Sequence, residues 1–467
     1  MRSTPSLDAR RGLEKLATYP FHVASWVDQT GYPVSVAVDA AIDPRSLSAT
    51  FAAPAGLPVP TDRDVSLTGS HIRPQPGYGY DERRHVTVWG RVAPGIRPDS
   101  MARLFTLTGR SAWGWDETEV PFFEYSERSV PRSRRYFDAL SAERGTPVKP
   151  RLSLGFLALR TTRLPFLTAT IVPVVLGIVI AASHGAFDLA AAALTVIGAS
   201  FVQLGLNVAN DVFDSVQGAD EANVTPTQFS GGSRVIQYGL VSLRQMATLA
   251  TAFYVAAALI GLVLLATHGS VALLVIGVLG FIVSLGYTAP PLKFVYRGLG
   301  EVAVAVGFGP LMLLGAYVVQ TGGTLAWEPF VASIPVALLV ALILYVNEIP
   351  DRRGDAYAGK RTLPVRFSRS AVIAGYNVAA AGAYLAVIVG VVGGLLPIPT
   401  LLMLLTIPLA RRVSAGLAPN YDNPYGLMAY MGVNVRLHLA AGVLLFVAYA
   451  IVIAAMAVAP GVDLFVG

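Results

Sequence analysis

The sequence contains no cysteine among its 467 residues, which excludes disulfide bonds, zinc–thiolate sites and thiol catalysis. Charged residues are also scarce, at 14%, whereas a soluble domain carries about 25%. The net charge of +6 is too weak to indicate nucleic-acid binding. Residues 1–20 lack the apolar segment of a signal peptide, so we expect no cleavable signal.

The shortage of charge is confined to one part of the chain. Residues 1–150 hold 19 of the 35 Lys and Arg residues and 17 of the 29 Asp and Glu residues. The much longer remainder holds only 16 and 12, by subtraction. The composition therefore predicts an ordinary soluble domain followed by a membrane domain.

The apolar part predicts an all-α membrane bundle of nine transmembrane helices. A spanning helix needs about 20 apolar residues to cross about 30 Å of hydrocarbon. Nine segments bounded by Gly, Pro or charge approach that length, near residues 165–184, 188–209, 246–267, 270–289, 301–319, 328–348, 371–391, 394–410 and 437–459.

The positive charges of this part alternate with the predicted spans. The connections after the first, third, fifth and seventh spans contain no Lys or Arg, and neither does the C-terminal tail. Cytoplasmic loops carry the excess of Lys and Arg in membrane proteins. We therefore expect the N-terminal domain and the even-numbered loops to be cytoplasmic, with the C-terminus outside.

Two polar clusters end the second and sixth predicted spans on the cytoplasmic side. The first, "NVANDVFDSVQGAD" at 207–220, contains Asn207, Asn210, Asp211, Asp214 and Asp220. The second, "NEIPDRRGD" at 347–355, contains Asn347, Glu348, Asp351 and Asp355. Helical residues four apart project from one face about 5–6 Å from each other, so each cluster predicts an oxygen-rich face.

Oxygen-rich faces of this kind suit hard divalent cations. Mg²⁺ is commonly held by one or two carboxylates plus substrate phosphates. We expect each cluster to hold a metal ion, with a diphosphate bridging them and leaving more easily because its charge is neutralised. Basic side chains of the predicted cytoplasmic loops are expected to bind phosphate oxygens: Arg234, Lys293, Lys360 and Arg361.

Two other interpretations of the acids stay open. The first is that they are solvated loop charges or helix caps, which we accept for Glu221, Arg352 and Arg353. The second is a cation or small-molecule transporter lined by the same acids. Transporters usually bind their substrates near the bilayer midplane, whereas these acids gather at one membrane surface, which favours chemistry on an amphiphilic substrate.

The motifs "NDVFD" at 210–214 and "DRRGD" at 351–355 resemble the "NDxxD" and "DxxxD" motifs of the UbiA superfamily of intramembrane prenyltransferases. The resemblance covers about residues 150–460, with one motif after the second helix and the other after the sixth. It implies Mg²⁺-dependent transfer of a polyprenyl group from its diphosphate to an aromatic acceptor. The apolar bundle would hold the isoprenoid tail and keep water from the allylic cation.

The resemblance also implies roles for individual residues. Asp211, Asp214, Asp351 and Asp355 would be catalytic, and together with Asn210 and Asp220 they would bind the metal ions. The substrate-binding residues would be Asn207, Asn210, Arg234, Tyr287, Lys293, Tyr296, Asn347, Lys360 and Arg361.

Within the superfamily, the chain resembles the 1,4-dihydroxy-2-naphthoate polyprenyltransferases of menaquinone biosynthesis (the MenA-like branch) most. Asp220 follows Asp214 by six residues, as in that branch, whereas benzoate-type enzymes usually place an acid at the position of Gly218. Glu348 and Pro350 depart from the "NNxRD" of that branch, which bears on the acceptor. We expect a quinone precursor such as dihydroxynaphthoate, with another lipid or aromatic acceptor as the alternative.

Residues 1–125 alternate apolar and polar side chains in short segments. "FHVASWVDQTGYPVSVAVDAAID" at 21–43 predicts two strands around a turn at Thr30–Gly31, and three further segments continue the pattern into a small β-barrel. The order weakly resembles the pyridoxamine 5'-phosphate oxidase-like split barrels. That implies FMN or a deazaflavin, phosphate contacts from His71, Arg73, Arg83 or Arg84, and a homodimer; surface charges are the alternative for these four residues.

Residues 126–160 are predicted to be a basic linker. Arg132, Arg134 and Arg135 would face anionic lipid headgroups, or simply solvent. The complete prediction is a soluble split β-barrel-like domain in residues 1–125, this linker, and a nine-helix prenyltransferase domain in residues 161–460.

Overall fold

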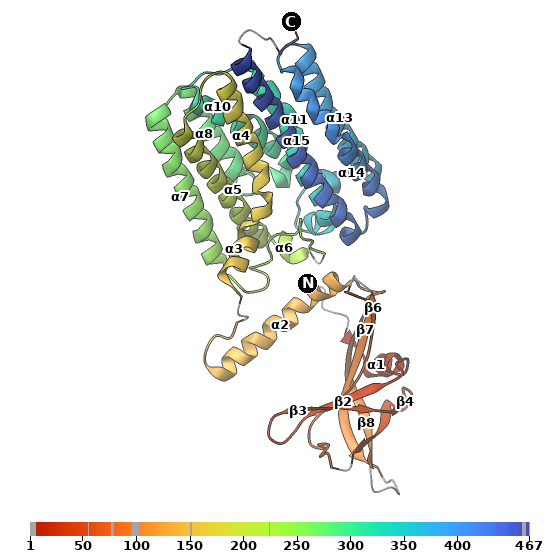
Figure 1. The fold of residues 1–467 in the computed structure, drawn as a ribbon. Helices are drawn as coiled ribbons and strands as arrows, with labels where there is room; N and C mark the ends of the chain where they lie inside the picture. The colour runs from red at the N-terminus through yellow and green to blue at the C-terminus, as the bar shows by residue number, and fades with distance from the viewer. Residues whose placement is uncertain are drawn as a thin grey trace. The chain divides into compact units, whose positions relative to one another are not determined.

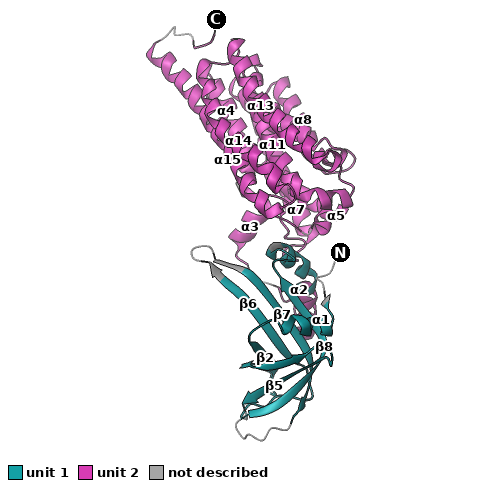
Figure 2. Ribbon diagram, turned by 90° about the vertical axis from the view of Figure 1, so that its right-hand side faces the viewer, with its two compact units in different colours: residues 1–133 teal, residues 134–467 magenta. Residues whose placement is uncertain are grey.

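A computed structural model describes residues 6–54, 56–75, 79–95, 102–149, 152–223, 225–459 and 464–466. The chain divides into two compact units, residues 1–133 and residues 134–467 (Figure 2). The first unit is built on strands and the second on helices. The boundary falls inside one helix, α2 (Phe122–Arg144), so the predicted linker is largely helical.

One antiparallel sheet forms most of the first unit (Figure 1). Its strands are β1 (Ser6–Leu7), β2 (His22–Val27), β3 (Pro33–Val38), β4 (Ala40–Asp43), β5 (Ser48–Pro54), β6 (Val65–Gln75), β7 (Gly79–Pro94) and β8 (Ala102–Asp116). They pair in the order β3-β2-β6-β7-β8-β5-β4, with β1 added beside β8. The predicted hairpin around Thr30–Gly31 is confirmed as β2 and β3.

The predicted barrel is wrong in its closure. Among the described strands no ladder joins β3 to β4, the two ends of the path. The chain itself connects these ends, because β3 stops at Val38 and β4 starts at Ala40. Their Cα atoms therefore lie within about 7 Å. A hairpin loop commonly has at least two residues, so the sheet curls until its ends meet at Asp39 without pairing there.

The core of the first unit lies between this sheet and the helix α1 (Ala9–Leu16). Leu13 and Leu16 of α1 are completely buried together with Phe51 and Leu107 of the sheet. A Cβ atom on Gly12 would lie 2.2 Å from the Cβ atom of Ala112. The helix backbone thus packs directly on β8, which only glycine allows at this position.

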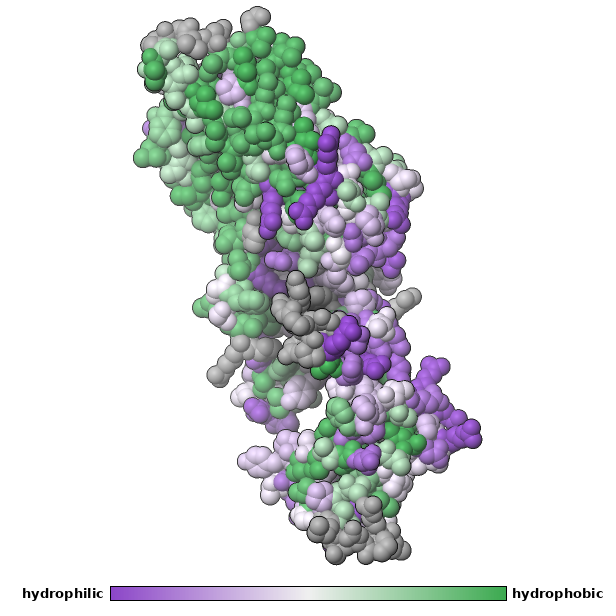
Figure 3. Space-filling view, turned by 45° about the vertical axis from the view of Figure 1, so that its right-hand side comes forward, coloured by the Kyte–Doolittle hydropathy of each residue, from purple (hydrophilic) through white to green (hydrophobic). Residues whose placement is uncertain are grey.

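The second unit contains long apolar helices, which show that this is a multi-pass membrane protein. Among the described residues, seven helices are long and apolar enough to cross a membrane: Leu189–Gln217, Leu243–His268, Gly300–Gln320, Trp327–Tyr357, Arg369–Val392, Ile398–Asn420 and Pro424–Val458. Apolar side chains cover most of this unit in the space-filling view (Figure 3). These helices match seven of the nine predicted spans.

The other two predicted spans correspond to shorter helices, α4 (Thr168–Ser183) and α8 (Val271–Gly286). Each has 16 residues, which is about 24 Å at 1.5 Å per residue. That length falls short of a bilayer core of about 30 Å. Nine spans therefore stay a prediction, since helix length confirms only seven.

The helix α11 (Trp327–Tyr357) is the most buried of the long helices. It packs against α9 (Gly300–Val306), α13 (Arg369–Val392) and α15 (Pro424–Val458). The second helix that bears on the site is α5 (Leu189–Gln217), which packs along α7 (Leu243–His268). Both α5 and α11 carry a predicted acidic motif in their last turns, so the bundle determines how these motifs meet.

A separate polar cluster lies at the other end of α11, in its first turn. His184, which follows α4, places its Nδ1 atom 2.9 Å from the hydroxyl of Tyr317 and its Nε2 atom 2.7 Å from Glu328 Oε2. Tyr317 belongs to α10 (Met312–Gln320). The cluster therefore connects α4, α10 and α11 far along the bundle from the acidic motifs.

This cluster predicts a pH-dependent stability. The hydrogen bond that His184 donates to Glu328 raises the pKa of His184, although burial opposes it. The stabilisation is therefore complete below the ordinary histidine pKa of about 6.5 and is lost as the pH rises through the higher folded-state pKa. Because the imidazole is 35% exposed, we expect a loss of only about 1–3 °C in melting temperature.

Thermal unfolding in detergent at about pH 6 and about pH 8, which bracket the ordinary histidine pKa, measures this effect. The informative quantity is the difference between the wild type and His184→Gln, since other groups titrate as well. Glu328→Gln should remove the same pH-dependent part. Equal pH dependence in the wild type and His184→Gln would refute the assignment.

Candidate active site

The two acidic motifs lie together at one end of the bundle. Asn210, Asp211 and Asp214 project from the last turns of α5, and Asp351 and Asp355 from the last turns of α11. The predicted i,i+4 pair on α5 is confirmed, because Asn210 Nδ2 donates to Asp214 Oδ2 at 3.2 Å. Pro350 lies inside α11, which continues to Tyr357 without a break.

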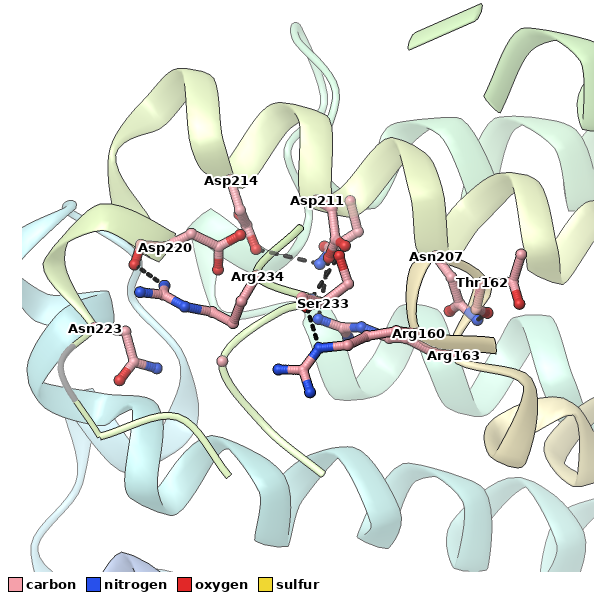
Figure 4. Close-up of polar contacts among 12 residues, drawn as sticks. Arg160, Thr162, Arg163, Asn207, Asp211, Asp214, Asp220, Asn223, Ser233 and Arg234 are labelled. Carbon is pink, nitrogen blue, oxygen red and sulfur yellow. Dashed lines mark hydrogen bonds and ion pairs between the residues drawn. The ribbon is translucent and has the colours of Figure 1, made fainter. Parts of the chain in front are cut away.

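Asp211 is held by partners that the sequence did not indicate. Arg163 Nη2 lies 3.1 Å from its Oδ1 atom, and the backbone N–H of Ser233 donates to its Oδ2 atom at 3.1 Å (Figure 4). The residue is only 2% exposed. Both carboxylate oxygens of Asp211 are thus occupied by protein donors.

Asp214 lies at the centre of a second group of contacts. Lys360 Nζ donates to its Oδ2 atom at 2.8 Å, and the Tyr296 hydroxyl donates to its Oδ1 atom at 2.8 Å. The same Lys360 Nζ lies 3.7 Å from Asp355 Oδ1. Burial lowers the pKa of Lys360, but Asp214 and Asp355 outweigh it and the net pKa is raised. Lys360 is therefore a fixed cation between the two motifs.

Asn223 and the loop at residues 225–234 complete the site from a third direction. Asn223 Nδ2 donates to Asp351 Oδ1 at 2.8 Å, and the Gly231 backbone N–H donates to Asp351 Oδ2 at 2.9 Å. Gly231 and Gly232 both have positive φ. A Cβ atom on Gly232 would lie 2.7 Å from Asp220 Oδ2. Glycine is thus required where this loop touches the acids.

Asp220 is another buried acid of the first cluster. It lies in the short helix α6 (Ala219–Ala222) and is 5% exposed. Arg234 donates to its backbone carbonyl (Figure 4), and its Oδ2 atom has no hydrogen-bond partner in the described part of the chain. Burial, followed by Asp211 and Asp214, raises its pKa. A cation would relieve this buried carboxylate.

These groups surround a cavity of about 170 Å³, here called the acid cavity. Its charged lining comprises five acids and two cations, which gives a formal charge of 2 − 5 = −3: Asp214, Asp220, Glu348, Asp351 and Asp355 against Arg163 and Lys360. Buried like charges are unfavourable unless they are compensated. The acid cavity therefore calls for additional positive charge.

A larger apolar cavity of about 570 Å³ lies between α5, α7, α8 and α10. It is lined almost entirely by aliphatic side chains and glycines, among them Gly198, Gly261 and Gly277. Five residues line both cavities: Gln203, Leu206, Tyr287, Val304 and Phe308. A polar space and an apolar space are therefore adjacent, which suits a ligand with one charged end.

The predicted site residues divide into three groups. Those that line the acid cavity are Asn207, Asn210, Asp214, Asp220, Tyr287, Asn347, Asp351, Asp355 and Lys360. Those that touch a lining residue without lining the cavity themselves are Asp211, Tyr296 and Arg234. In the third group, Lys293 lies beside Tyr296, 5.5 Å from its ring, and Arg361 is exposed.

Four contributors were missed by sequence reasoning: Arg163, Asn223, Gly231 and Ser233. Arg163 stands just before the first predicted span, where positive charge is ordinary. The run "SGGSR" at 230–234 was the available signal, since consecutive glycines permit a backbone N–H to approach a carboxylate. No pattern in the sequence predicts that this loop contacts α11.

The predicted phosphate-binding cations of the first unit are engaged elsewhere. Glu82 pairs with His71 at 3.5 Å and with Arg73 at 2.9 Å. Arg83 forms an ion pair of 2.5 Å with Glu117, and Arg84 lies over the ring of Tyr19. Each of these four residues therefore already contacts a protein side chain.

The donor set of the acid cavity fits Mg²⁺. No group of three acidic or histidine side chains in the described residues surrounds a single point, because Arg163, Lys360 and Asn223 hold the carboxylates apart. The ligand chemistry is nevertheless that of a hard cation: Asn210 Oδ1 and Asp220 Oδ2 are buried oxygens without partners in the described structure. Asp214, Asp220, Asp351 and Asp355 would supply the charge.

Comparison with known proteins matches this part of the chain to one family. The model of the "UbiA prenyltransferase family" matches residues 170–428. The 1,4-dihydroxy-2-naphthoate octaprenyltransferase of Bacillus subtilis is 26% identical over 287 residues, which are 62% of this chain and 90% of that protein. The enzyme of the same name from Escherichia coli is 32% identical over 214 residues, 45% of this chain and 67% of that protein.

A solved structure is similar to the second unit as well. A UbiA homolog from Archaeoglobus fulgidus, bound to DMAPP and Mg²⁺, aligns with a TM-score of 0.43 and 15% identity. The alignment covers 62% of this chain and 99% of that one.

Proposed function

The chain belongs to the UbiA prenyltransferase family, and on that premise we propose that it transfers a polyprenyl group from a polyprenyl diphosphate to an aromatic acceptor within the membrane. The observation that carries the proposal is the acid cavity. Asp214, Asp220, Asp351 and Asp355 converge there from α5, α6 and α11 beside an apolar cavity. One end of the site suits a metal-bound diphosphate and the other an isoprenoid.

Charge supports a requirement for Mg²⁺. The acid cavity already has a formal charge of −3, so a diphosphate would enter a space of its own sign. Mg²⁺ would neutralise the charge of the diphosphate and act as a Lewis acid when the diphosphate leaves. We propose Asn210, Asp214, Asp220, Asp351 and Asp355 as the ligands, with Asp211 positioned behind them by Arg163.

The chain's own residues would then bind and orient the substrates. Lys360 and Arg163 line the cavity and would contact diphosphate oxygens. The bond between the first prenyl carbon and oxygen breaks, and its electron pair leaves with the diphosphate. A carbon–carbon bond forms to the acceptor ring, and the substituted ring carbon loses its proton, or CO₂ where it carries a carboxylate. Phe308, Val340 and Ile343 line the same cavity and would exclude water from the cationic carbon.

The apolar cavity would receive the isoprenoid tail. Its volume of about 570 Å³ is enclosed by α5, α7, α8 and α10, and it shares Tyr287 and Phe308 with the acid cavity. A tail can therefore continue from the diphosphate into aliphatic surroundings. Burying each CH₂ group contributes about 0.8 kcal/mol.

We propose a quinone precursor such as dihydroxynaphthoate as the acceptor, since the named relatives are 1,4-dihydroxy-2-naphthoate octaprenyltransferases. Mass spectrometry of products tests this directly. The purified chain receives Mg²⁺, geranylgeranyl diphosphate and either 1,4-dihydroxy-2-naphthoate or other aromatic and lipid acceptors. A prenylated naphthalene is expected. If product forms only with a different acceptor, the proposed acceptor is wrong and the proposed reaction stands. Ion flux in proteoliposomes without any prenylated product would support a transporter instead.

The remaining assignments concern the surroundings of the enzyme. We propose that residues 161–460 form the prenyltransferase domain with nine spans, and that residues 1–125 and the acid cavity face the cytoplasm. The antiparallel sheet supports a separate domain in residues 1–125. FMN or deazaflavin binding and dimerisation through it are tested by the visible absorbance and the mass of the purified chain.

A further inference from the structure

A buried glutamate of the acid cavity has no role in the site described above. Glu348 lines the cavity from α11 and is 5% exposed. Neither of its carboxyl oxygens accepts a hydrogen bond from a donor group within the described residues. A buried polar group without a donor is destabilising. Such a group in the wall of a substrate cavity indicates a missing ligand atom.

The surroundings of Glu348 make the need for a donor stronger. The helix α9 packs against α11 and contributes Glu301, which is 7% exposed and whose Oε1 atom also lacks a partner among described groups. Glu301 lies within hydrogen-bonding reach of Glu348, so the two carboxyl groups can bind each other only if one of them is protonated. Two neighbouring buried carboxyl groups repel each other when both are ionised. A ligand that donates hydrogen bonds would satisfy them, whereas a ligand carboxylate there would be rejected.

Glu348 lies near the place that the first prenyl carbon would occupy. It precedes Asp351 by three residues on α11, so it lies on the same helix face about 4.5 Å further into the bundle. Reacting atoms must approach within about 3–3.5 Å. An acceptor held at Glu348 would therefore face the first prenyl carbon of a diphosphate held at Asp351.

We propose that Glu348 binds a hydroxyl group of the acceptor, so that the acceptor is a phenol or hydroquinone whose oxygen donates to this carboxyl group. This inference rests on the proposed prenyl transfer and adds the feature by which the acceptor is recognised. Glu348 only accepts the hydrogen bond, and the hydroxyl keeps its proton. Any carboxylate on the acceptor points away from Glu348 and Glu301.

Methyl ethers of the acceptor test the proposal without any substitution. Sites built to bind a hydroxyl reject an analogue that lacks it by about 10⁴–10⁵-fold in the best cases. We expect kcat/KM of the wild type to fall at least about 100-fold when both hydroxyls of the acceptor are methylated. A ratio near one between the two acceptors overturns the proposal.

Substitution of Glu348 localises the effect. Glu348→Leu and Glu348→Gln should lower kcat/KM for the hydroxylated acceptor and reduce the discrimination against the ether, while KM for the prenyl diphosphate changes little. Glu328→Gln, at the other end of the same helix, is the matched control and should keep wild-type activity. Unchanged discrimination in both Glu348 variants overturns the proposal. Absence of product from the wild type with every aromatic acceptor would overturn the proposed function as well.

Discussion

Asp214→Asn is expected to lower kcat for prenyl transfer by about 10³-fold or more, because one carboxylate serves three contacts. Asp214 binds Lys360 and Tyr296 and lies beside Asn210. Asparagine keeps the shape but removes the negative charge that a Mg²⁺ ion requires. Product formation at saturating diphosphate and acceptor measures the effect, with elution from a sizing column showing that the variant is folded.

A matched substitution distinguishes the loss of the Asp214 carboxylate from the loss of any negative charge at that end of the bundle. Asp422 is 58% exposed and pairs with Arg352 and Arg369. Asp422→Asn should therefore leave activity within about twofold of the wild type, since exposed ion pairs contribute little. If Asp214→Asn is as active as Asp422→Asn, the metal assignment is wrong.

Lys360→Met is expected to produce the second largest effect, on both activity and stability. The Lys360 side chain is 10% exposed and neutralises Asp214 and Asp355. Removing one partner of a buried ion pair leaves an uncompensated charge and costs about 3–5 kcal/mol. The lost contact to diphosphate should also lower kcat/KM for the prenyl diphosphate by about 10²-fold.

Steady-state kinetics with Mg²⁺ and thermal unfolding in detergent without added metal measure the two effects. Lys149→Met replaces an exposed lysine and is the control. Lys360→Arg should restore much of the stability, because the charge is kept, but less of the activity. A Lys360→Met chain with the melting temperature and kcat/KM of the control would show that Lys360 is a peripheral charge.

The acidic motifs could be predicted because helix geometry is local. The four-residue spacing of Asn210 and Asp214 is enough to place both on one face, and the structure joins them at 3.2 Å. The apolar segments could be predicted for the same reason, since length and hydropathy follow from the residues themselves. Seven of the nine segments are long enough in the structure.

The partners of the acids could not be predicted because they depend on contacts distant in sequence. Asp211 is held by Arg163 and Asp351 by Asn223, which are separated from them by 48 and 128 residues. Arg361 follows Lys360 directly but is exposed, because the chain turns there. The sequence gives no reason to expect different burial for Lys360 and Arg361, and only the fold shows that one is buried and the other exposed.

The same limit applies to the first unit. Alternation of side chains located its strands, whereas closure of the barrel depends on how β3 and β4 meet. One residue, Asp39, separates them, and this short connection prevents a ladder between the sheet edges. Strand content was therefore predictable and the closure was not.

The central claim is that the acid cavity binds the diphosphate through Mg²⁺. Calorimetric titration with a geranylgeranyl thiolodiphosphate, which resists transfer, measures this binding without turnover. The account predicts clear binding to the wild type in Mg²⁺, no measurable binding in EDTA, and none to Asp214→Asn or Asp351→Asn in either condition. Equal affinity with Mg²⁺ and with EDTA would contradict it.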